Sequence, residues 1–160
     1  MLDISHWSVL IIGGGRIAER KLQGLIKEAG QVTVLAPQVT ERIADWVSKG
    51  QVIWLQQAYQ GPVDLQGYQM VFACTDHSEV NQAIAEELGP GQLINQTGNK
   101  RASNFFNMKT INHEGYLIAI SSQGQSPAGA KALGESIASY LKDKENWIWP
   151  LIVSEREAAG

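Results

Sequence analysis

The chain has 160 residues, of which 44% are hydrophobic and 18% charged, and its formal net charge is −3. This length allows one full hydrophobic core with a small appendage, and the acidic balance argues against a nucleic-acid binder held by phosphate contacts. No stretch reaches the roughly 18 apolar residues of a membrane span, and residues 1–12 lack the basic leader of a signal peptide. The single cysteine, Cys74, fits a reducing cytoplasm, and three scattered histidines predict no metal site.

Residues 8–21, S-V-L-I-I-G-G-G-R-I-A-E-R-K, predict a strand, a tight turn and the start of a helix. Gly13, Gly15 and Ala18 match the G-x-G-x-x-G/A dinucleotide pattern. In that pattern Gly13 permits the turn, Gly15 admits a pyrophosphate, and the small Ala18 lets the helix lie close to the sheet. The helix N-terminus then favours phosphate groups. A glycine-rich turn can also be purely structural, and this remains the alternative.

Strands and helices alternate as far as residue 96. The first helix is expected to end with Gly30 as its C-cap. It is followed by a strand at 32–35, a helix at 40–48 capped by Thr40, a strand at 52–56, a loop or short helical turn at 58–69, a strand at 70–74, a helix at 78–88 and a strand at 92–96. This alternation predicts an α/β protein with a Rossmann-type, doubly wound parallel sheet.

The end of the second predicted strand reads Ala36, Pro37, Gln38. A Rossmann protein usually carries an acidic residue here for the adenosine ribose, or an arginine for a 2′-phosphate. Neither is present, so backbone groups or Gln38 would meet the ribose hydroxyls. The sequence favours NAD over NADP as cofactor.

The pattern changes beyond residue 96. Strands at 106–111 and 116–122, joined by a turn at 113–115, predict a hairpin, and a helix follows with Ser126 as N-cap and Pro127 in its first turn. Trp147 and Trp149 then either pack back on the domain or contact a partner subunit. We expect a nucleotide domain at 1–111 and a hairpin and helix segment at 112–160 for dimerisation and substrate cover.

Five segments carry a family resemblance that spans most of the chain: V-L-I-I-G-G-G-R-I-A-E-R-K, V-T-V-L-A-P, V-F-A-C-T-D, L-I-N and G-Y-L-I-A-I-S-S-Q-G-Q-S-P. In these segments the chain resembles the precorrin-2 dehydrogenase and sirohydrochlorin ferrochelatase family of siroheme biosynthesis. The resemblance implies NAD-dependent oxidation of the tetrapyrrole precorrin-2 to sirohydrochlorin by a homodimer. The residues it implies for cofactor binding are Gly13, Gly14, Gly15, Arg16, Ile17, Ala36, Pro37, Thr75 and Asp76.

The resemblance also implies substrate contacts at Asn95, Ser126, Lys100 and Arg101. For Ser126, a plain N-cap is an equal alternative, and for Lys100 and Arg101 a solvated charged loop is the alternative.

The chain departs from the family pattern at one position and in its length. Family members with both activities usually carry V-N-x-x-D after the fifth strand, and Gly98 stands where that aspartate would be. Glycine can neither accept a proton nor bind iron, which argues against ferrochelatase activity. The chain also stops soon after Trp149, whereas family members commonly continue into a helical domain.

Asp76 is the remaining carboxylate at a strand end, and we take it as the candidate catalytic residue. Capping of the next helix and binding of the ribose are alternative roles for it. A catalytically degenerate NAD(H)-binding or nucleotide-binding regulatory module therefore remains an alternative to the enzyme.

Overall fold

The computed structural model describes residues 2–123 and 125–143. The chain divides into two compact units, the first ending at Phe105 and the second beginning at Phe106. The sequence analysis placed this boundary at residue 111, within the hairpin. The structural boundary lies earlier because both strands of the hairpin pair with each other and so fall in the second unit. The terminal tryptophans, Trp147 and Trp149, lie outside the described residues.

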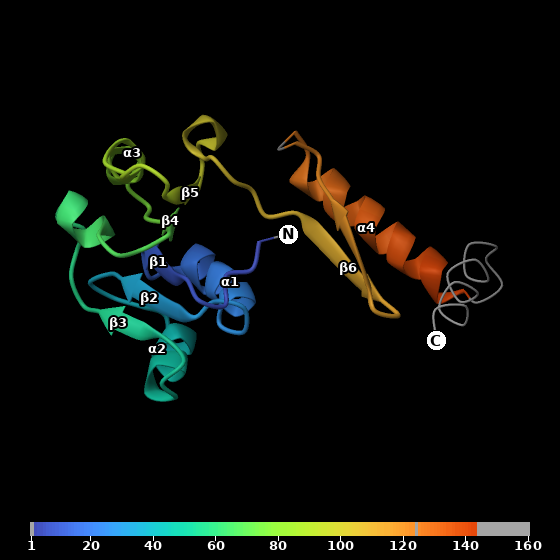
Figure 1. Cartoon of the computed structure of the whole chain (residues 1–160), viewed down its shortest axis with the longest axis horizontal. Coiled ribbons are helices and arrows are strands. Elements are labelled where there is room, and N and C mark those ends of the chain that lie inside the picture. The colour runs from blue at the N-terminus through green and yellow to red at the C-terminus, as the bar shows by residue number, and fades with distance from the viewer. Residues whose placement is uncertain (1, 124, 144–160) are drawn as a thin grey trace. The chain divides into compact units, whose positions relative to one another are not determined.

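A five-stranded parallel sheet forms the centre of the first unit (Figure 1). Its strands are β1 (Ser8–Ile12), β2 (Gln31–Leu35), β3 (Ile53–Leu55), β4 (Met70–Ala73) and β5 (Leu93–Gln96), in the order β3-β2-β1-β4-β5. The chain winds outward in one direction from β1 to β3 and then in the other from β4 to β5. This confirms the predicted doubly wound sheet and places its switch point between β1 and β4.

Helices cover both faces of the sheet. Helices α1 (Arg16–Leu25) and α2 (Glu41–Ser48) pack on one face, where Val9 and Ile11 belong to the same buried cluster as Leu22 and Ile43. Helix α3 (Ser78–Glu86) packs on the other face, where Leu10 and Ile84 belong to a second buried cluster. The 3-10 helix η1 (Pro62–Leu65) contributes Leu65 to this second cluster. Because β1 is buried on both faces, its sequence is continuously apolar.

Helix α1 ends earlier than the sequence predicted. Its C-cap is Ile26, so the prediction of Gly30 as the cap is wrong. Gly30 instead packs against the N-terminal segment: its N–H donates to the Ile4 carbonyl at 3.1 Å, and a Cβ at this position would lie 2.5 Å from the Ser5 carbonyl oxygen. This glycine is therefore required by a tertiary contact and not by helix termination.

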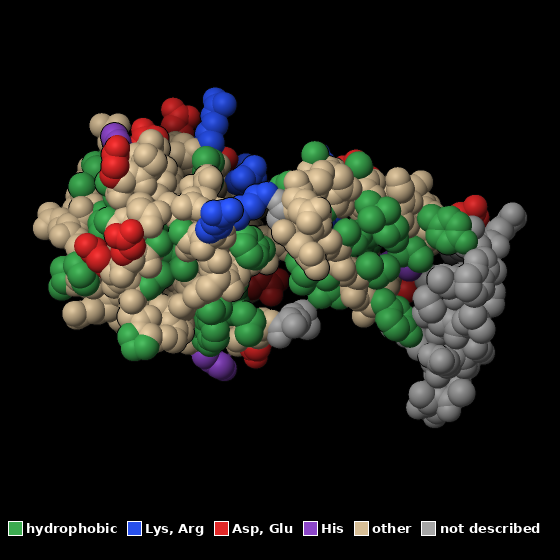
Figure 2. Space-filling model, turned by 90° about the horizontal axis from the view of Figure 1, so that it is seen from above, with side chains coloured by type: hydrophobic (Ala, Val, Ile, Leu, Met, Phe, Trp, Pro, Cys, Tyr) green, Lys and Arg blue, Asp and Glu red, His purple; other side chains and the backbone are tan. Residues whose placement is uncertain are grey.

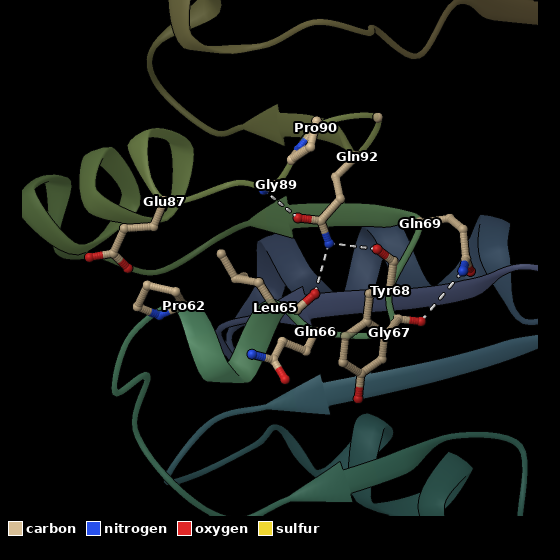
Figure 3. Close-up of a pocket in the computed structure, with 11 residues that line it drawn as sticks. Pro62, Leu65, Gln66, Gly67, Tyr68, Gln69, Glu87, Gly89, Pro90 and Gln92 are labelled. Carbon is tan, nitrogen blue, oxygen red and sulfur yellow. Dashed lines mark hydrogen bonds between the residues drawn. The ribbon is translucent and has the colours of Figure 1, made fainter.

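The side chain of Gln92 ties together the chain at the amino ends of β4 and β5 (Figure 3). Its Nε2 donates to the carbonyls of Leu65 and Tyr68 at 2.7 and 2.6 Å, and its Oε1 accepts from the Gly89 N–H at 2.7 Å. A shallow hollow of about 530 Å³ lies beside these groups. These hydrogen bonds pair backbone groups of the loops that would otherwise need water as a partner, so the role of Gln92 is structural.

The second unit consists of a hairpin and a helix. Strands β6 (Lys109–His113) and β7 (Tyr116–Ile120) are antiparallel, and α4 (Pro127–Lys142) follows. The first strand begins three residues later than predicted and includes His113, because the reversal needs only Glu114 and Gly115, with φ of 46° and 84°. Gly134 lets the helix approach the strands, since a Cβ there would lie 2.7 Å from Cγ of Lys109.

Apolar side chains gather on the surface of the second unit, over β7 and α4 and the segment before β6 (Figure 2). Met108, Leu117 and Leu133 are about half exposed, at 52%, 46% and 53%. A two-stranded sheet with one helix buries little apolar surface by itself. None of the described helices has the length and apolar character needed to cross a membrane.

Candidate cofactor site

A cavity of about 750 Å³ opens at the carboxyl ends of the parallel strands, above the switch point between β1 and β4. Open α/β sheets bind their ligands at this position. The cavity is lined by the glycine turn, the loops after β2 and β3 and the β4–α3 junction: Ile12–Ile17, Leu35–Gln38, Ala58, Tyr59, Cys74–His77 and Val80. All of the predicted cofactor residues therefore line one cavity.

The three glycines of the turn have different roles. Gly13 has φ of +117°, and a Cβ there would lie 2.6 Å from the Cys74 carbonyl oxygen. A Cβ at Gly14 would collide with the carbonyl oxygen of Gln38. A Cβ at Gly15 would meet no protein atom. Gly13 and Gly14 are thus required by the fold, whereas Gly15 leaves open space where a pyrophosphate can approach, and the turn fits a dinucleotide.

The helix N-termini at this cavity lack side-chain caps, in contrast to two helices elsewhere. No side chain caps α1 at Gly15 or α3 at His77, but Thr40 caps α2 and Ser126 caps α4. Uncapped N–H groups and the positive end of the helix dipole favour an anion. The arrangement suits phosphate groups at α1 in particular, because its first residues, Arg16 and Ile17, line the cavity.

The loop after β2 is fastened to the glycine turn and to α1. The Thr40 N–H donates to the Gly14 carbonyl at 3.0 Å, and its hydroxyl donates to Oε2 of Glu19 at 2.9 Å. Glu19 also pairs with Arg42 at 3.4 Å, and the Arg42 guanidinium lies 5.2 Å from the centre of the Trp46 ring. Arg42 is thus held away by other partners and does not line the cavity.

Thr75 forms the cavity wall at the end of β4, and Asn81 holds it in place. Asn81 is 3% exposed; its Oδ1 accepts from the Thr75 N–H at 3.1 Å and from the Thr75 hydroxyl at 2.8 Å, and its Nδ2 donates to the Thr75 carbonyl at 2.9 Å. These bonds satisfy a strand end that would otherwise expose backbone groups. Periodicity alone did not indicate this role of a helical asparagine.

Asp76 points into solvent at the cavity rim. Its side chain is 93% exposed, and its carboxylate lies 3.5 Å from Nε2 of His77. The N-cap of α3 is His77, so the alternative of Asp76 as N-cap is wrong. The roles of base and ribose ligand are both compatible with its position at the cavity rim.

Gly98 lies beside a second hollow, of about 650 Å³, which shares Thr75 and Asp76 with the cofactor cavity. Its φ is +92°, so a side chain there would be strained although a Cβ would meet no atom. Lys100 and Arg101 are exposed in the 3-10 helix η2 (Lys100–Ala102), which Asn99 caps at 3.1 Å. Among the described residues, no three His, Cys, Asp or Glu side chains gather as a metal site.

Asn95 is nearly buried, with 8% exposure, and both its polar atoms are engaged. Its Oδ1 accepts from Nζ of Lys21 at 2.8 Å, and its Nδ2 donates to the Phe105 carbonyl at 3.1 Å. Lys21 also lies 5.2 Å from the centre of the Phe72 ring, and burial lowers its pKa. The geometry favours a positioning role for Asn95. Sequence reasoning missed the pairing of Lys21 with Asn95, because the two residues lie 74 positions apart.

Ser126 belongs to the second unit, where its Oγ accepts from the Gly129 N–H at 3.0 Å. This is the N-cap that the sequence predicted for α4. The bond accounts for the serine structurally.

The comparisons with known proteins agree with this geometry. Residues 1–108 match a family model described as "Putative NAD(P)-binding". The chain is 31% identical over 139 residues to the precorrin-2 dehydrogenase of Priestia megaterium, covering 87% of this chain and 68% of that protein. It is 29% identical to the precorrin-2 dehydrogenase of Bacillus subtilis, covering 88% and 86%.

Longer relatives and a solved structure extend the comparison. The chain is 32% identical to siroheme synthase 3 of Aeromonas hydrophila over 83% of its own length, but spans only 28% of that protein. The solved structure of SirC, a precorrin-2 dehydrogenase, superposes with a TM-score of 0.78 at 31% identity, covering 88% of this chain and 69% of SirC. The chain therefore belongs to the NAD(P)-binding family of the precorrin-2 dehydrogenases and siroheme synthases.

Proposed function

We propose that this protein oxidises precorrin-2 to sirohydrochlorin with NAD⁺ as hydride acceptor. The observation that carries the proposal is the cavity above the β1–β4 switch point, with open space at Gly15 and an uncapped α1. Two relatives that this chain covers over most of their length are named precorrin-2 dehydrogenases. The cofactor would supply the hydride chemistry, and the protein would bind and orient the reactants.

NAD is preferred over NADP in this proposal. A 2′-phosphate needs a cationic partner near the end of β2, where Ala36, Pro37 and Gln38 line the cavity. Arg42 follows shortly after but is paired with Glu19. We expect NADP⁺ to bind at least tenfold more weakly than NAD⁺, measured by titration calorimetry.

Asp76 is the proposed acceptor of the proton that leaves precorrin-2 when its hydride leaves. The reaction converts precorrin-2 and NAD⁺ to sirohydrochlorin, NADH and a proton. A carboxylate at the cavity rim would accept that proton as a general base. Asp76→Asn should lower kcat at least tenfold and leave the affinity for NAD⁺ unchanged. A parallel loss of NAD⁺ affinity would instead assign Asp76 to the ribose.

The substrate carboxylates of the tetrapyrrole need cationic partners, and we assign Lys100 and Arg101 to them. Both are exposed and neither forms an ion pair with a described acidic residue. Asn95 would act by holding the β5 end in place. Ser126 would line the substrate as well as cap α4.

A homodimer formed through the second unit would cover its apolar surface. Met108, Leu117 and Leu133 are exposed on a unit that buries little apolar surface by itself. Leu133→Glu should shift the sedimentation coefficient to that of a monomer, whereas Glu135→Ala on the same helix should not.

The buried, reduced Cys74 is consistent with a cytoplasmic location, which we also propose.

The deciding experiment mixes purified protein with anaerobically prepared precorrin-2 and NAD⁺, and follows NADH and sirohydrochlorin absorbance together. A Gly98→Asp variant is assayed in parallel. Turnover by the parent supports the proposal and makes the family aspartate dispensable for dehydrogenation. No turnover by a parent that still binds NAD⁺ contradicts it.

A regulatory nucleotide-binding module is the second candidate, and Gly98 is the observation that favours it. The residue offers no base, and its φ of +92° strains any side chain that replaces it. This candidate predicts NAD(H) binding without turnover. Activity gained only in Gly98→Asp would mark a family member that has lost its chemistry.

A further inference from the structure

The loop between β3 and η1 is mostly exposed, but its one aromatic side chain is partly buried. Residues 56–58 and Gln60 are exposed, whereas Tyr59 is partly buried and packs against the cluster that contains Leu65 and Ile84. Asp64 fixes the loop on either side of Tyr59, accepting from Nε2 of Gln57 at 3.2 Å and from the Gln60 N–H at 2.7 Å. The loop is thus built to hold Tyr59 in one place.

The hydroxyl of Tyr59 is anchored to the far end of α3. It donates to Oε2 of Glu87, the C-cap residue of α3, at 2.6 Å. Burial and the neighbouring Glu87 carboxylate raise the pKa of Tyr59, so the phenol remains a donor throughout the physiological pH range. Figure 3 shows the Glu87 side chain directed away from the Gln92 hydrogen bonds, which leaves it available to Tyr59.

Tyr59 lines the cofactor cavity on the side where an adenosine would lie. The pyrophosphate of a dinucleotide is expected at the α1 N-terminus, and its adenosine ribose at the end of β2. Strand β3 lies next to β2 at the outer edge of the sheet, and Ala58 and Tyr59 follow it. Together with Leu35 and Ala36 at the end of β2, they give this side of the cavity an apolar surface, as suits a purine ring.

We propose that Tyr59, held by Glu87, is the residue that fixes the adenine of the cofactor, so that the end of α3 controls nucleotide affinity. The inference rests on the proposed nucleotide site, but it does not depend on the reaction carried out there. Removing an aromatic ring that stacks on a base commonly lowers the affinity about tenfold or more.

The test is calorimetric titration of the full chain with AMP, which carries only the adenosine half, and with NAD⁺. The variants are Tyr59→Leu, Tyr59→Phe and Glu87→Ala. Tyr68→Leu is the matched control, because Tyr68 packs on the same cluster but lines the hollow beside Gln92 (Figure 3) and not the cofactor cavity. Thermal melting of each variant reports stability separately from binding.

We expect Tyr59→Leu to weaken AMP and NAD⁺ about tenfold. Tyr59→Phe and Glu87→Ala keep the ring but lose its anchor, and should weaken both about threefold. Tyr68→Leu should lower Tm without changing either affinity. Wild-type AMP affinity in the Tyr59 variants, or equal losses in Tyr59→Leu and Tyr68→Leu, would overturn the inference.

Two further outcomes separate this inference from the proposed function. If Tyr59→Leu does not fold, Tyr59→Phe and Glu87→Ala decide alone, and wild-type affinity in both overturns the inference. A parent that binds AMP in this way but does not oxidise precorrin-2 leaves the inference supported and removes only the reaction. A parent that binds NAD⁺ but no AMP overturns only the inference, and a parent that binds neither overturns both.

Discussion

The side-chain amide of Asn81 makes three hydrogen bonds to Thr75, at 2.8, 2.9 and 3.1 Å. One residue of α3 thereby bonds to the N–H, the carbonyl and the hydroxyl of Thr75, two residues beyond the end of β4. Thr75 lines the cofactor cavity and Asn81 does not, so Asn81 affects the site only by holding Thr75 in position. Fold stability and cofactor binding are therefore coupled at this pair.

Asn81→Ala should both destabilise the protein and weaken NAD⁺ binding. The substitution removes the partners of the Thr75 N–H and carbonyl, which costs about 1–3 kcal/mol of unfolding free energy. Urea unfolding and NAD⁺ titration measure the two effects, and Glu79→Ala, at an exposed position of the same helix, is the control. An Asn81→Ala protein with wild-type affinity would show that Thr75 does not need Asn81 to bind the cofactor.

Gly15→Ala and Gly14→Ala should separate binding from folding. A Cβ at Gly15 faces open space, and its φ of −86° suits alanine, so Tm should be unchanged while NAD⁺ affinity falls at least tenfold. A Cβ at Gly14 would collide with the Gln38 backbone, so Gly14→Ala should lower Tm as well. Melting curves and titrations of both variants provide the comparison. Unchanged affinity in Gly15→Ala would argue that no phosphate approaches this residue.

The parallel sheet and the glycine turn could be predicted from sequence because their signals are local. Strands β1 and β4 are buried on both faces, and such strands are continuously apolar. The turn combines an apolar strand, three glycines and a helix, as the nucleotide pattern requires. The nine residues of the cofactor prediction converge on one cavity for the same reason: each follows the carboxyl end of a recognisable strand by at most five residues.

Contacts between distant residues could not be predicted. Gly30 has the position of a C-cap, but its neighbour is the Ser5 carbonyl, which no local pattern indicates. Tyr59 lies in a loop without periodicity, 28 residues before Glu87. Lys21 and Asn95 meet only because the fold brings the side chain of Lys21 on α1 to Asn95 on β5, 74 residues later. Such pairs depend on the packing of complete elements, so they follow from the fold and not from a motif.

Lys21 should make stability depend on alkaline pH. Burial lowers the pKa of Lys21 below its ordinary value of 10.5, so in the interval between the two values the unfolded chain binds more protons than the folded one. The contribution of Lys21 to unfolding free energy therefore rises with pH up to about 10.5. Urea unfolding of the wild type and Lys21→Met between pH 7 and about 10 should show this rise only in the wild type.

The control for this titration is Lys27→Met, because Lys27 is exposed just beyond α1. Lys27→Met should keep the wild-type pH dependence. Parallel curves for the wild type and Lys21→Met would show that the Lys21 pKa is the same in the folded and unfolded states.

Cys74 should react slowly with thiol reagents and more slowly still when cofactor is bound. Burial raises the pKa of its thiol, so at neutral pH little thiolate is present, and its Sγ accepts a hydrogen bond from the Thr97 hydroxyl at 3.5 Å. Because it is the only cysteine in the sequence, the modification rate reports one site. Cys74 also lines the cofactor cavity, so NAD⁺ should protect it. Alkylation by iodoacetamide at pH 7.5, followed by mass spectrometry with and without NAD⁺, measures both effects. The urea-unfolded chain sets the unprotected rate, and equal rates with and without saturating NAD⁺ would place the cofactor away from the end of β4.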